Sequence, residues 1–102
     1  MAHYFLKVIP QRSTFGEDAT EGELAKMNEH FAYWLELSKR GTAIIFGPVF
    51  DADGIYGMGI VESEDEAAAR LLAGADPAVV AGVVRITVSA MRVGAIRSTA
   101  DV

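Results

Sequence analysis

The sequence predicts a single α+β domain with the ferredoxin-like order β-α-β-β-α-β, in which four antiparallel strands carry both helices on one face. Two helical patterns and four strand-like runs alternate in this order along the chain. With 102 residues, the chain fits one domain over residues 1–102. We expect a structured core over residues 3–93 and a tail over residues 94–102.

The first strand and the loop after it occupy the N-terminal quarter of the chain. Residues 3–9 (HYFLKVI) are rich in aromatic and β-branched residues, which favours a strand. Pro10 lacks the N–H that a strand ladder needs, so we expect the strand to end there. Residues 10–23 are polar and predict a long loop, and loops of this length are often functional lids or flexible segments.

The long helix has the clearest signals at both ends. Thr20 and Glu23 form a capping-box pattern, and the helix is expected to run through Arg40, with Gly41 as the residue that ends it. Apolar and small residues recur between them at spacings of three and four, which predicts one buried stripe. The stripe comprises Leu24, Met27, Phe31, Leu35 and Ser38, and Trp34 widens it.

A hairpin follows the long helix. Residues 42–50 (TAIIFGPVF) predict a strand, and Gly47-Pro48 inside it indicates an edge strand or a bulge, with a bend at that point. Residues 51–54 (DADG) predict the hairpin turn, and residues 55–62 predict the returning strand. Gly57 and Gly59 fall on one face of that strand, which leaves room there for a helix, a ligand or a partner.

The second half of the fold is shorter. Ser63 and Glu66 form a second capping-box pattern, which predicts a helix over residues 63–74. Residues 78–84 are compatible with a helical turn or with extended chain. Residues 85–93 predict the last strand, with its side chains alternating between two faces. Ile86, Val88 and Ala90 share one face, and Arg85, Thr87, Ser89 and Met91 share the other.

Composition excludes several classes of protein. The net charge of −5 argues against nucleic-acid binding, which needs a basic surface. The absence of cysteine excludes disulfides, thiolate catalysis and cysteine-bound zinc. No histidine–histidine or histidine–carboxylate spacing predicts a metal site, and no motif predicts a cofactor. We see no signal peptide and no apolar run of roughly 20 residues, so we expect a cytoplasmic protein that binds no membrane.

The second face of the sheet is predicted to be apolar as well. A solvated face would place polar residues at every second position, whereas the last three strands keep apolar or small residues at both parities. We therefore expect a second copy of the chain to cover this face, sheet against sheet, in a homodimer or a higher homo-oligomer.

Two residues attract functional interest, although each has a structural interpretation. His30 lies at the border of the apolar stripe, where a histidine more often makes one hydrogen bond and stays structural. Asp76 precedes Pro77 after a helix, which is a common arrangement in turns. Arg85 and Arg92 could bind an anionic substrate, and the residues alone do not decide whether either reaches a pocket.

Read together, the stretches HFAYWLELSKRGTAIIFGPVFDADG and DPAVVAG resemble the YciI-like, or YCII-related, domain family. The resemblance covers residues 3–93. It implies a ferredoxin-like fold that dimerises through its sheets into a dimeric α/β barrel. It also implies that His30 and Asp76 meet in a pocket as a catalytic pair. Some members of the family eliminate HCl from chlorinated hydroxylated rings.

The pair implied by this resemblance has a simple physical role. A carboxylate that accepts from one imidazole N–H orients the ring and leaves the other nitrogen to shuttle a proton. We expect a small-molecule substrate to lie against five further residues: Trp34, Gly47, Pro48, Met58 and Ser89. The first hypothesis is a cofactor-independent lyase or isomerase. The alternatives are a metabolite-binding or regulatory module without catalysis, and an accessory domain in which the pair is purely structural.

Overall fold

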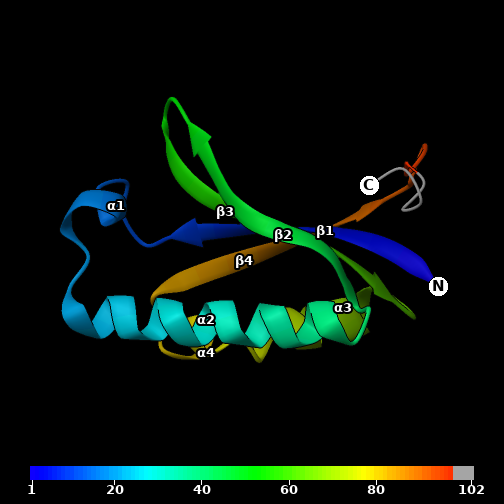
Figure 1. Ribbon diagram of the computed structural model, residues 1–102, viewed down its shortest axis with the longest axis horizontal. Coiled ribbons are helices and arrows are strands. Elements are labelled where there is room, and N and C mark those ends of the chain that lie inside the picture. The colour runs from blue at the N-terminus through cyan, green and yellow to red at the C-terminus, as the bar shows by residue number, and fades with distance from the viewer. Residues whose placement is uncertain (98–102) are drawn as a thin grey trace.

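The structure is a computed structural model of the chain, and it describes residues 1–97. One four-stranded antiparallel sheet has the strand order β2-β3-β1-β4, and α2, α3 and α4 lie on one side of it (Figure 1). This arrangement confirms the predicted ferredoxin-like α+β fold. In chain order, the elements are β1 (Ala2–Pro10), α1 (Phe15–Asp18), α2 (Glu21–Lys39), β2 (Ala43–Asp51), β3 (Gly54–Ser63), α3 (Glu66–Gly74), α4 (Pro77–Val80) and β4 (Val84–Met91).

The core lies between the sheet and the helices. On β1, Tyr4, Leu6 and Val8 are buried and alternate with half-exposed neighbours, because successive side chains of a strand point to opposite faces. The main core cluster joins residues of all four strands to residues of α2 and α3. Its buried members are Tyr4, Leu6, Trp34, Leu37, Ala43, Val61, Ala69, Ala73 and Val88. Within residues 1–97, no helix is both long enough and apolar enough to cross a membrane.

Both predicted ends of the long helix are confirmed. The Thr20 hydroxyl accepts from the amide of Glu23, and the Glu23 carboxylate accepts from the amide of Thr20. At the other end, Gly41 has a φ of 82°, which a glycine adopts without the steric penalty of a side chain. The amide of Thr42 then donates to the carbonyl of Leu37, which closes the helix with a Schellman motif.

The predicted buried stripe of α2 is only partly right. Trp34 and Leu37 are the residues of α2 that are fully buried, and Leu37 was not in the stripe. Leu24 and Phe31 remain substantially exposed because they face an open cavity and not a packed core. Leu35 is also exposed. The apolar spacing along α2 therefore reflects a cavity wall as much as a core.

Two further predictions need correction. Residues 10–23 are not only a loop, since the short helix α1 interrupts them. Ser63 does not cap α3: it pairs with Ala2 as the last residue of β3, and Asp65 accepts from the amide of Ala68 instead. The expectation of an edge strand or a bulge at Gly47-Pro48 is confirmed in its first form, since β2 is an edge strand of the sheet, and the bulge in β2 lies between Ala43 and Ile45.

The remaining boundaries follow the sequence closely. The DADG turn joins β2 to β3, with Asp51 paired to Gly54. Of the residues left ambiguous, the first three belong to the helical turn α4 and Val84 begins the last strand. That strand ends at Met91, two residues earlier than expected. The predicted tail is described only as far as residue 97, and the rest of it lies outside the described residues.

Gly57 of β3 lies close to Val8 of β1. A Cβ atom at this position would lie 3.0 Å from the Cβ of Val8, so a side chain fits only if one strand shifts. We therefore expect Gly57→Ala to lower the free energy of unfolding by about 1–3 kcal/mol, as for other overpacked cores. Urea denaturation followed by tryptophan fluorescence measures this change.

Gly74→Ala is the matched control for this substitution. Gly74 ends α3 and has open space around its Cβ position, so alanine there should be neutral or stabilising by up to about 1 kcal/mol. Equal unfolding midpoints for Gly57→Ala and the wild type would show that the two strands do not constrain each other here.

Candidate functional site

An open cavity of about 720 Å³ lies between α2, the β2–β3 hairpin and the segment that contains α1. Most of its wall is apolar. Trp34, Phe31 and Met58 line it, as do Gly57 and Gly59. The two glycines therefore do leave space for a ligand on the helix side of the sheet. His30 supplies an imidazole to this apolar surface.

His30 and Asp76 lie 46 positions apart in the sequence and are hydrogen-bonded in the structure. The Nδ1 atom of His30 contacts Oδ2 of Asp76. The Asp76 side chain is 0% exposed, whereas the His30 side chain is 15% exposed and lines the cavity. A ligand in the cavity can thus touch His30, while Asp76 has no exposed surface to offer it.

The local structure at the end of α3 explains the position of Asp76. It is the N-cap residue of α4, with an extended backbone, and Pro77 occupies the first position of that helix. A residue before proline is steered toward extended geometry, and proline at this helix position loses no hydrogen bond. Oδ1 of Asp76 accepts from the amide of Ala78 at 2.9 Å. Oδ2 is left pointing at α2.

Trp34 makes the third contact to this carboxylate. Its indole Nε1 donates to Oδ2 of Asp76 at 2.8 Å, in addition to the contact from His30. Burial raises the pKa of Asp76, but the hydrogen bonds from His30, Trp34 and the Ala78 amide outweigh burial and bring the pKa below its ordinary value. The carboxylate is therefore ionised at neutral pH. An ionised carboxylate only accepts, so Nδ1 of His30 carries the proton and Nε2 is free for a ligand.

The other residues predicted to touch a substrate divide into two groups. Gly47 and Pro48 line the cavity together with Trp34 and Met58. Ser89 does not: it is exposed on β4 and pairs with Phe5 on the face of the sheet opposite to the helices. Arg85 and Arg92 are also exposed and lie outside the cavity wall. The prediction that Ser89 touches a substrate is therefore not supported, because Ser89 lies on the same face of β4 as Arg85.

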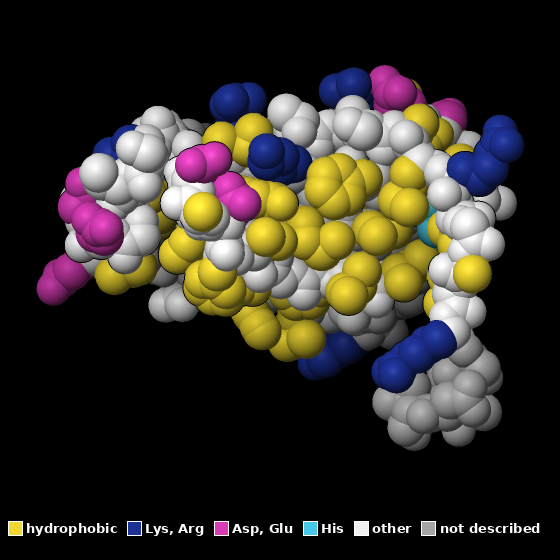
Figure 2. All heavy atoms as spheres, turned by 90° about the horizontal axis from the view of Figure 1, so that it is seen from above, with side chains coloured by type: hydrophobic (Ala, Val, Ile, Leu, Met, Phe, Trp, Pro, Cys, Tyr) yellow, Lys and Arg dark blue, Asp and Glu magenta, His cyan; other side chains and the backbone are white. Residues whose placement is uncertain are grey.

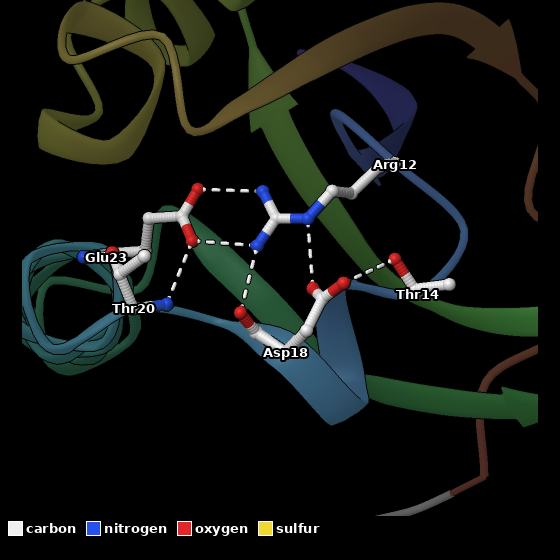
Figure 3. A network of polar contacts seen from close by, with 5 residues as sticks. All are labelled: Arg12, Thr14, Asp18, Thr20 and Glu23. Carbon is white, nitrogen blue, oxygen red and sulfur yellow. Dashed lines mark hydrogen bonds and ion pairs between the residues drawn. The ribbon is translucent and has the colours of Figure 1, made fainter.

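Arg12 holds the segment that covers one end of the cavity. We call residues 11–19, which include α1, the lid segment. The Arg12 guanidinium lies between two carboxylates (Figure 3), donating to both oxygens of Glu23 at 2.8 Å and to Asp18 at 2.8 Å. Phe15 of the lid segment packs into a second buried cluster with Val8. Arg12 therefore fastens the lid segment to the first turn of α2.

The charges in this network stabilise one another. The hydrogen bond from Arg12 and that from the Thr20 amide lower the pKa of Glu23 to about 2. Thr14 and Arg12 likewise hold the pKa of Asp18 below its ordinary value. Arg12 lines the cavity, but both of its carboxylate partners are already in place. Arg12 therefore fastens the lid segment, a role that we call the latch, and its guanidinium is already paired rather than available to an anionic ligand.

Sequence reasoning missed Arg12 and Phe15 as cavity residues. It also missed that the Trp34 N–H points at Asp76. Within residues 1–97, no group of three or more histidine, aspartate or glutamate side chains is placed to hold a metal ion.

Comparison with known proteins places the chain in a family. The model of the YCII-related domain matches residues 10–91, which is most of the chain. The chain belongs to the YCII-related domain family. A comparison with curated proteins found no match.

One solved structure of similar fold is 5-chloro-2-hydroxyhydroquinone dehydrochlorinase (TftG) from Burkholderia phenoliruptrix AC1100, in complex with 2,5-dihydroxybenzoquinone. The TM-score is 0.60 at 18% identity, and the match covers 89% of this chain and 95% of that one. At this identity the likeness establishes the shared fold alone.

The latch predicts how the lid segment opens. Arg12→Gln removes the ion pairs with Asp18 and Glu23, so we expect the amides of residues 15–19 to exchange with solvent several-fold faster. Hydrogen exchange measured by NMR checks this. Arg70→Gln is the control, because it breaks an exposed Arg–Glu pair in α3 that is remote from the lid segment.

Acid should open the lid segment of the wild type in the same way. Because folding lowers the pKa of Glu23, its contribution is complete above roughly pH 5 and is lost as the pH falls toward 2. Unchanged exchange of residues 15–19 in both experiments would contradict the latch.

Proposed function

We propose that this YCII-related protein is a cofactor-independent lyase or isomerase in which His30 transfers a proton to or from a small molecule. The single observation that carries the proposal is the hydrogen bond between a buried, ionised Asp76 and a cavity-lining His30. Burying a charged group costs stability, so a buried carboxylate beside a cavity favours a functional role. Orienting an acid–base group is a role that fits the contact with His30. Asp76 serves as the positioning residue and His30 as the catalytic one.

The proposed step uses only these groups. Nε2 of His30 accepts a proton from an acidic C–H or O–H of the substrate, and Asp76 stabilises the imidazolium that forms. The electron pair left on the substrate then expels a leaving group, which gives an elimination. Alternatively, His30 returns the proton to another atom of the conjugated system, which gives an isomerisation. Both routes balance without an oxidant or reductant.

The nature of the cavity and the structural relative support a ring-shaped substrate. Trp34, Phe31 and Phe46 offer flat apolar surfaces in the cavity that His30 lines. TftG, named as a dehydrochlorinase, was solved with 2,5-dihydroxybenzoquinone bound. Chlorinated hydroxylated rings are therefore the first substrates to test, with release of chloride as the signal for elimination.

His30→Asn separates catalysis from binding. Asparagine keeps an N–H near Asp76 but cannot transfer the proton, so we expect turnover to fall at least about 100-fold, as for loss of a general base. Chloride release from 5-chloro-2-hydroxyhydroquinone measures turnover. A thermal shift with 2,5-dihydroxybenzoquinone measures binding, which should persist in the variant.

The same pair of measurements tests the alternative, a metabolite-binding or regulatory module. Such a module would bind the quinone without turnover in the wild type. Turnover that survives in His30→Asn would refute the proton-transfer role outright. If His30→Ala changes neither binding nor stability, the site itself has been assigned wrongly.

We also propose that the open face of the sheet is the interface of a homodimer. A large part of this face is hydrophobic, and the charged side chains lie mostly toward its margins (Figure 2). It carries Phe5, Ile60 and Ile45, the last of which is 54% exposed. An antiparallel sheet that faced water would be polar at these positions.

Ile45→Glu is expected to break the dimer. It would bury a charge in the middle of an apolar interface, so light scattering after size exclusion should give a dimer for the wild type and a monomer for the variant. Leu71→Glu is the matched control, because Leu71 is 76% exposed on α3, on the helix side of the sheet. A wild-type protein that is monomeric at concentrations of tens of micromolar would contradict this proposal.

A further inference from the structure

The carboxylate of Asp76 is shared between two side chains of α2. His30 and Trp34 are four residues apart, which places them one above the other on the same helix face. Their ring centroids are 6.5 Å apart, and both direct a nitrogen at Oδ2 of Asp76. The amide of Ala78 occupies the other oxygen. The carboxylate is thus held by three donors, only one of which can take part in proton transfer.

Trp34 differs from His30 in how firmly it is held. It belongs to the main core cluster and packs edge-on against Tyr33, with ring centroids 5.7 Å apart. Its indole has a single polar group, which can only donate. Since Oδ2 of Asp76 receives that N–H, the core fixes the place where Oδ2 lies. His30, at the cavity wall, meets an acceptor that is already in position.

We propose that Trp34 is a positioning residue, whose indole N–H holds Oδ2 of Asp76 so that the His30 proton stays on Nδ1 and Nε2 faces the cavity. The catalytic meaning of this role rests on the proposed function, but the hydrogen-bond arrangement does not. Trp34 thereby has two roles. Its ring is part of the cavity wall, and its indole nitrogen holds the Asp76 carboxylate that contacts His30.

Two NMR measurements on the ligand-free protein test the role. The chain has two histidines, so in ¹⁵N-histidine-labelled protein His3 serves as the internal reference for His30. We expect wild-type His30 to be protonated on Nδ1, and Trp34→Phe to lose part of this tautomer. The ¹³C signal of the Asp76 carboxyl group should titrate at a higher pH in the variant, because one donor to its charged form is gone.

Tyr33→Phe is the matched control. It also removes one part-buried donor of α2, the hydroxyl that donates to the carbonyl of Leu72 at 2.6 Å, but it leaves the donors of Asp76 in place. A general loss of stability would affect both variants, whereas loss of positioning affects Trp34→Phe alone. An equal change of the His30 tautomer in both variants would overturn the proposal.

A second variant keeps the shape of the core. Trp34 is the single tryptophan of the chain, so biosynthetic replacement of tryptophan by 3-benzothienylalanine exchanges only its N–H for sulfur. This protein should show the same changes as Trp34→Phe, and wild-type behaviour would refute the role of the indole N–H. Turnover retained in His30→Asn would instead refute the proposed function and leave this result intact.

Discussion

The buried carboxylate of Asp76 is the constraint on which the site depends. A charge with no access to solvent is costly unless it is paired and hydrogen-bonded, and removing one partner of such a pair typically costs about 3–5 kcal/mol. Asp76 meets this demand with donors from α2 and from the turn that begins α4. The bonds that make its burial tolerable also join α2 to α4 and orient the His30 ring at the cavity wall. Stability and site geometry therefore have the same cause.

The cavity exists because the sequence leaves space where a core would normally be filled. Gly57 and Gly59 face the helices from β3, and Leu24 and Phe31 extend toward that space from α2 without closing it. The lid segment covers one end of the space and is held by the ion pairs of Arg12 and by Phe15, which packs into the second buried cluster. Charge networks at the surface weaken with salt, whereas the buried Asp76 contacts are screened much less.

The sequence predicted those features that depend on neighbouring residues. The Thr20 capping box, the glycine at 41 and the DADG turn are local arrangements, and all three are present. The cap at Ser63 was wrong because a distant residue, Ala2, draws Ser63 into the sheet. The latch at Arg12 depends on partners that a polar loop does not reveal. No local pattern brings His30 to Asp76, which is why the pairing was expected only from the family resemblance.

The strand register decides which residues of the sheet face the helices and which face the open side. The helix side needs small residues on β3 for the cavity, and the open side needs apolar ones for the proposed dimer. Because side chains alternate, a slip of β3 by one residue would turn Met58 toward the helices and Gly57 outward. The close approach of Gly57 to Val8 opposes that slip, since a larger residue facing Val8 would force the strands apart. A single glycine thereby protects both the cavity and the open face, and its contribution lies in the register rather than in any contact with a ligand.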